Sequence, residues 1–117
     1  MNNEETEPRG SRVELLNVIA TYLIELNEHR AELYTALKTG RVTPSSKSNF
    51  FKSFKRFYDM TADIVTDDKL LTEIEDWFDN YNDKKLMRGI ELSREHQKQL
   101  ESIFPIFQMR IKPPYIE

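Results

Sequence analysis

The sequence predicts an all-α fold: a four-helix bundle with a long N-terminal helix and a kinked C-terminal helix. Apolar residues recur at the three- and four-residue spacing of helices in almost every segment. No stretch alternates apolar and polar residues for long enough to indicate a strand. The three glycines and five prolines stand mostly at the margins of the periodic segments. A chain of 117 residues can bury one modest core without disulfides, and this chain has no cysteine.

The chain divides into one domain with two short extensions. Residues 1–10 (MNNEETEPRG) lack the apolar run of a signal peptide. We predict instead that they form a disordered acidic leader. Residues 11–112 form the helical-bundle domain, and residues 113–117 form an extended tail that begins at two prolines. No apolar stretch approaches the ~20 residues needed to span a bilayer. We therefore expect no membrane insertion and a cytoplasmic location.

The first helix is expected to run from Arg12 to Thr39. Ser11 and Glu14 form a capping-box pattern, and Gly40 is a typical helix stop. Two apolar seams follow this helix, and a helix with two seams needs neighbours on two sides. It is therefore either central in the monomer or shared between the core and an oligomer interface. The first seam, which we expect to be the interface, contains Leu15, Ile19, Tyr22, Leu26, His29 and Leu33.

The second and third helices each have one apolar arc. After a turn at Thr43 and Pro44, five aromatic residues between Phe50 and Tyr58 fall within one arc of the second helix. The third helix begins at residues 66–68, where the helix dipole favours acidic side chains. Its apolar arc includes Trp77. Both arcs must be buried.

The last part of the chain is expected to contain two helical pieces. Asp83 could cap a short helix that Gly89 ends, and Ser93 could cap a final helix. Pro105 lies inside the apolar pattern of that final helix, which should kink or restart there. The predicted common core of the four helices consists of Leu16, Leu23, Phe54, Phe57, Ile74, Trp77, Phe78, Leu100 and Phe104.

Charge is strongly segregated along the chain. Residues 33–58 carry six basic and no acidic side chains, whereas residues 59–83 carry nine acidic and one basic. The basic side chains are Lys38, Arg41, Lys47, Lys52, Lys55 and Arg56. They could pair with the acidic third helix, or they could bind nucleic acid. We favour pairing, because the cations of the second helix lie opposite its aromatic residues and Asp59 lies one turn from Lys55.

The sequence carries no pattern that indicates an enzyme, a metal site or a cofactor. His29 and His96 are the only histidines, and neither has an acidic residue three positions before it, as di-iron bundles require. Glycine-rich phosphate loops, nucleophile elbows and His-Glu-x-x-His patterns are also missing from the sequence.

The sequence therefore favours a non-enzymatic protein–protein interaction or assembly module, with a homo-oligomer or another protein as partner. We expect a homodimer through the first seam, because an uncovered seam of that length would be an unusually large apolar patch. His29 in that seam would make association sensitive to pH near neutrality. The alternative is a nucleic-acid-binding accessory subunit that uses the basic surface at residues 38–56.

Overall fold

The computed structural model describes residues 3–107, with side chains from residue 14 onward. Four α-helices follow one another: α1 (Asn3–Thr39), α2 (Pro44–Thr61), α3 (Asp68–Asp79) and α4 (Leu86–Ile103), with a single 3₁₀ turn, η1 (Asp83–Lys85), before α4. No strand occurs in this part of the chain. The all-α bundle is therefore confirmed. The molecule measures 57 × 27 × 23 Å.

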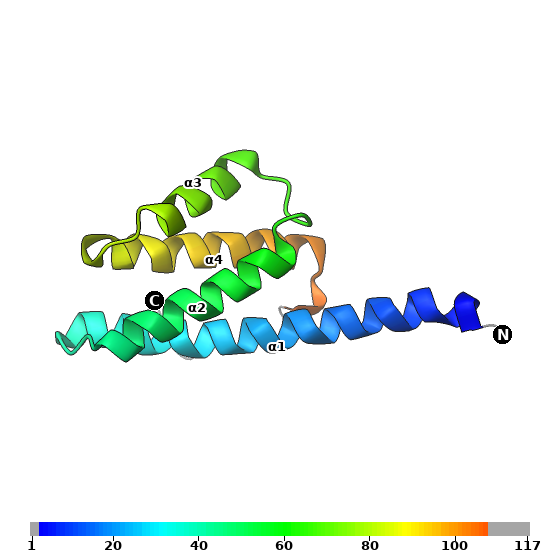
Figure 1. The fold of residues 1–117 in the computed structure, drawn as a ribbon, viewed down its shortest axis with the longest axis horizontal. Helices are drawn as coiled ribbons and strands as arrows, with labels where there is room; N and C mark the ends of the chain where they lie inside the picture. The colour runs from blue at the N-terminus through cyan, green and yellow to red at the C-terminus, as the bar shows by residue number, and fades with distance from the viewer. Residues whose placement is uncertain (1–2, 108–117) are drawn as a thin grey trace.

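The helices form two antiparallel pairs (Figure 1). The chain reverses after α1 at Gly40, whose φ of 70° is the left-handed conformation that favours glycine. α2 then packs along the C-terminal half of α1, and α3 packs against α4. The N-terminal part of α1 projects beyond the other helices (Figure 1).

α1 begins earlier than the sequence predicted. Its described backbone is helical from Asn3. The division of the chain into a leader over residues 1–10 and a domain from residue 11 stays a prediction. The predicted tail, residues 113–117, lies outside the described residues and stays a prediction.

The core lies between the two helix pairs and is rich in aromatic side chains. Six of the nine predicted core residues are buried, and the other three, Leu16, Phe78 and Phe104, are partly buried and pack against the same cluster. Trp77 of α3 is the centre of the aromatic part, with Phe50, Phe51 and Phe54 of α2 at 5.8–6.0 Å between ring centroids. Its indole N–H donates to the Lys85 carbonyl at 2.8 Å.

α4 differs from the expected pair of helical pieces. It runs without a break from Leu86 to Ile103, so the predictions that Gly89 ends a helix and that Ser93 begins one are wrong. Ser93 is fully buried in mid-helix, where its hydroxyl donates to the Ile90 carbonyl at 2.8 Å. The cap before α4 also differs, because Asn82, rather than Asp83, accepts the backbone N–H of Lys84.

The end of α4 lies close to the predicted position. The helix ends at Ile103, two residues before Pro105, which has no backbone N–H to continue it. The described chain stops at residue 107 and does not confirm a kink.

Gly89 is needed because α4 passes directly over the indole ring of Trp77. A Cβ atom at position 89 would lie 2.6 Å from Trp77 Cε2, and closer still to Cζ2. Gly89→Ala would gain about 1 kcal/mol of helix propensity but would cost about 1–3 kcal/mol through overpacking of a buried ring. We expect net destabilisation, measured by urea unfolding. A more stable Gly89→Ala protein would contradict this packing.

Candidate interaction surfaces

The structure divides the first seam of α1 between the core and the surface. Ile19, Leu26 and Leu33 are fully buried inside the monomer, so these three predicted interface residues are core residues. Leu15 is 44% exposed. Tyr22 and His29 are half-buried. These three residues are buried because α2 and α4 both pack on α1 and together cover a wide arc of it.

A buried polar group that the sequence did not reveal joins α1 to α4. Arg30 is only 1% exposed, and its guanidinium donates to Ser93 Oγ at 3.2 Å and to Gln97 Oε1. It also donates to Asn27 Oδ1 at 3.0 Å. Arg30 follows Leu23 by seven residues and Leu26 by four, and this spacing was the available signal for its burial. Such buried polar contacts can fix the register between two helices.

His96 of α4 is fully buried between aromatic rings of α2. Thr61 donates its hydroxyl proton to the Phe57 carbonyl at 2.7 Å, so His96 Nε2–H donates to the Thr61 oxygen at 2.7 Å. His96 Nδ1 is then the unprotonated nitrogen, and it has no hydrogen-bond partner among the described residues. Burial lowers the pKa of His96 to about 4, because the charged imidazolium would lose its hydration.

The structure therefore predicts loss of stability in mild acid. The unfolded chain binds a proton at His96 near pH 6.5, whereas the folded chain does so only near pH 4. Stability from the neutral ring is complete above pH 6.5 and should fall by about 3 kcal/mol as the pH decreases to 4. Urea unfolding of wild type and His96→Leu across this range isolates the contribution of His96. If the free energy of unfolding changed with pH in the same way for both proteins, His96 would not be the cause of the loss.

Exposed aliphatic side chains occur on α1 where it leaves the bundle and at the C-terminal end of α4. Ile19 is the first buried residue of α1 among those with described side chains, and just before it Leu15 and Val18 are 44% and 38% exposed. At the C-terminal end of α4, Ile103 and Ile106 are 42% and 48% exposed. The end of α4 lies at the same level along the long axis as the point where α1 leaves the bundle (Figure 1).

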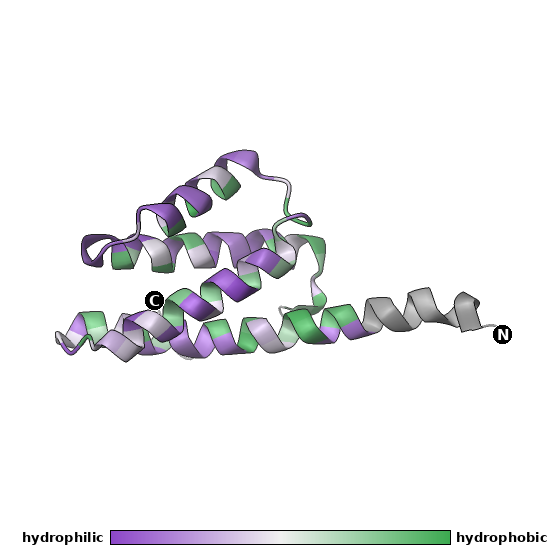
Figure 2. Cartoon of the chain, in the orientation of Figure 1, coloured by the Kyte–Doolittle hydropathy of each residue, from purple (hydrophilic) through white to green (hydrophobic). Residues whose placement is uncertain are grey.

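We call Leu15, Val18, Ile103 and Ile106 the end patch. Figure 2 shows the hydrophobic colouring of α1 and of the chain after α4 at this level. The remaining exposed large hydrophobic residues of the described chain, Ile24 and Met87, are not part of it.

Half of the predicted basic surface is neutralised by nearby carboxylates. Among the described residues, Lys47 pairs with Asp83 at 3.0 Å. Lys55 pairs with Asp59 at 2.9 Å, and Arg56 pairs with Glu25 of α1 at 3.2 Å. The other three cations, Lys38, Arg41 and Lys52, are exposed, and Lys38 lies over the Tyr34 ring at 5.5 Å. The basic residues therefore do not form one continuous positive surface.

The acidic helix α3 pairs mainly with α4 and not with α2. Glu73 accepts a hydrogen bond from Arg88 of α4 at 2.6 Å, and this bond raises the pKa of Arg88. No ion pair joins α2 to α3 among the described residues, so the expected pairing along their flanks is not observed. Instead, the Tyr58 hydroxyl donates to Glu75 at 2.7 Å, and burial together with this carboxylate raises the pKa of Tyr58.

The described part of the chain holds no group of three or more acidic or histidine side chains arranged to bind a metal ion. In the same part, none of the helices is both long and apolar enough to cross a membrane. Comparisons with protein-family models, curated proteins and solved structures found no match to this chain.

Proposed function

We propose that the protein is an interaction or assembly module that associates with a second copy of itself through the N-terminal half of α1. The proposal rests on the end patch and on the length of α1, which extends beyond the helices that pack on it. α1 has 37 residues and α2 has 18. At ~1.5 Å per residue α1 is about twice as long, so a substantial part of it lacks a neighbour in the bundle.

The spacing of two exposed residues and the half-buried Tyr22 supports helix pairing. Leu15, Val18 and Tyr22 are separated by three and four residues, which places them on one face of α1. Leu15 and Val18 of that face belong to the end patch. A two-fold arrangement would cover it in both copies with one self-complementary contact. His29 lies seven residues after Tyr22 on the same face.

Introducing negative charge at the end patch tests the proposal. Leu15→Glu combined with Val18→Glu places two carboxylates on the proposed contact and should abolish self-association while leaving the fold intact. In sedimentation velocity, we expect wild type to dimerise in the range of ~10 μM, which corresponds to about 7 kcal/mol. The double variant should stay monomeric throughout that range.

A matched control adds the same charge elsewhere on α1. Ile24 is 46% exposed, and Thr35 is also exposed, on a different face of the helix. Ile24→Glu combined with Thr35→Glu should dimerise like wild type. A wild-type protein that is monomeric at tens of micromolar would refute the proposal. The proposal would also fail if the control variant lost dimerisation to the same extent as the end-patch variant.

Nucleic-acid binding through residues 38–56 remains the alternative. It rests on Lys38, Arg41 and Lys52, because the other three cations already contact carboxylates. Phosphate contacts would make affinity fall steeply with salt. Absence of salt-dependent binding to a DNA or RNA oligonucleotide would eliminate it.

A further inference from the structure

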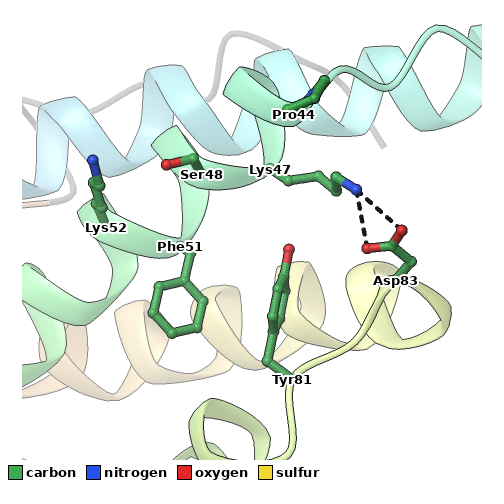
Figure 3. Close-up of a pocket in the computed structure, with 7 residues that line it drawn as sticks. All are labelled: Pro44, Lys47, Ser48, Phe51, Lys52, Tyr81 and Asp83. Atoms are coloured by element: carbon green, nitrogen blue, oxygen red, sulfur yellow. Dashed lines mark hydrogen bonds and ion pairs between the residues drawn. The ribbon is translucent and has the colours of Figure 1, made fainter.

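A second candidate site lies at the other end of the bundle, where α2 begins. A cavity of about 380 Å³ opens between the first turns of α2 and the loop that joins α3 to η1 (Figure 3). α2 contributes Pro44, Lys47, Ser48, Phe51 and Lys52, and the loop side contributes Tyr81 and Asp83. This volume falls within the range of ordinary ligand pockets. None of these residues belongs to the end patch.

The floor of the pocket is aromatic and held in place by the core. The rings of Phe51 and Tyr81 meet edge to face, with centroids 5.0 Å apart. Both rings also contact the buried Trp77, at 5.9 and 5.2 Å between centroids. Because Trp77 is anchored by its bond to the Lys85 carbonyl, the floor is formed before any ligand arrives. A preformed apolar floor favours insertion of an apolar side chain.

The rim of the pocket is polar and mainly cationic. The Lys47 ammonium lies 3.0 and 3.1 Å from the two Asp83 oxygens, and the exposed Lys52 lies elsewhere on the rim (Figure 3). The Tyr81 hydroxyl is directed toward α2 (Figure 3), and burial raises the pKa of Tyr81, so this group remains a protonated donor. Asp83 is the one acidic residue of the lining, against two lysines.

We propose that this pocket binds an acidic peptide segment that inserts one large apolar side chain. The apolar side chain would lie on the floor of Phe51 and Tyr81, and a flanking carboxylate would contact Lys52, because Lys47 already contacts Asp83. Apolar surface predominates in the lining. A nucleic-acid strand would need several phosphate contacts, and the lining offers only Lys52 besides the lysine that contacts Asp83, so the peptide fits better. The proposal goes beyond self-association and does not depend on it.

The test is an NMR titration of the ¹⁵N-labelled full chain with a probe peptide in which a leucine–phenylalanine pair is flanked on both sides by glutamates. We expect shift changes at the amides of the pocket lining and at the Trp77 indole N–H, which lies beneath the floor. Lys52→Glu should weaken binding about tenfold. Lys98→Glu is the matched control, because Lys98 is exposed on α4, is not part of the lining and undergoes the same charge change.

Ser48→Trp provides a second variant, because the residue is exposed on α2 and a larger side chain there would fill the pocket without cutting into the core. It should abolish binding while circular dichroism shows an unchanged helical content. A peptide with lysines in place of the glutamates, and one with alanines in place of leucine and phenylalanine, should each fail to bind.

Several outcomes would overturn the proposal. The proposal fails if no chemical-shift changes occur at about 1 mM probe peptide, or if they are confined to α1. It also fails if Lys98→Glu weakens peptide binding as much as Lys52→Glu does. Equal binding of a single-stranded DNA oligonucleotide at the same residues would also overturn it, because the site would then be a general anion site. Loss of dimerisation in the end-patch variants leaves these pocket results unaffected, so the two proposals fail separately.

Discussion

Replacing Trp77 with alanine is expected to lower the free energy of unfolding by about 3–5 kcal/mol. The side chain is 3% exposed and contacts aromatic rings from α2, from its own helix and from the following loop. Its removal leaves a cavity between α2, α3 and Gly89 of α4, and it leaves the Lys85 carbonyl without this donor.

Urea unfolding followed by circular dichroism measures this loss, since the variant has no tryptophan for fluorescence. Met87→Ala serves as the control, because that side chain is apolar but 38% exposed, and the change should cost less than about 1 kcal/mol. A similarly small loss for Trp77→Ala would show that the aromatic cluster is not the centre of the core.

Leu26→Glu is expected to unfold the protein. Leu26 is fully buried in α1, and an unpaired carboxylate there, together with the lost leucine contacts, should cost about 5 kcal/mol. Most small domains have only ~5–15 kcal/mol of stability in total. Circular dichroism should show a large loss of helix, or a much lower melting temperature.

This variant distinguishes the two roles considered for the first seam. A folded, monomeric Leu26→Glu protein would mean that the seam is an interface and not part of the core. Leu15→Glu on the same seam is the matched control, since Leu15 is 44% exposed and the same change there should leave the fold stable.

Helix existence could be predicted from sequence because it depends on local periodicity. The aromatic arc of α2 indicates which face of that helix is buried, and the acidic residues at the start of α3 indicate where that helix begins. Both signals are local and do not depend on the rest of the fold. Thr43 caps α2 in the structure, and Asp67 caps α3, as their residue types favour.

The division of the last segment could not be predicted from local signals. Gly89 and Ser93 resemble a helix stop and a helix start, but tertiary contacts determine both residues. Gly89 is required by the ring of Trp77, and Ser93 lies where Arg30 of α1 reaches α4. These partners are distant in sequence, so no local pattern records them.

The candidate interaction surface could be predicted only in part. Periodicity placed Leu15 and Leu26 on the same seam, but it could not show that neighbouring helices cover one and not the other. The contribution of Ile103 and Ile106 depends on where α4 ends relative to α1, which is a property of the tertiary fold. The burial of Arg30 and His96 likewise follows from the packing of α4 on α1 and α2.

If two copies meet at the exposed face of α1, distances between spin labels in the dimer will report that contact. The chain has no cysteine, so Val18→Cys and Thr72→Cys each provide one labelling site, and Thr72 is exposed on α3. We predict a short, narrow intermolecular distance distribution for labels at position 18. Labels at position 72 should be farther apart. No intermolecular signal from position 18, or a shorter distance from position 72, would mean that the two copies do not meet at this face of α1.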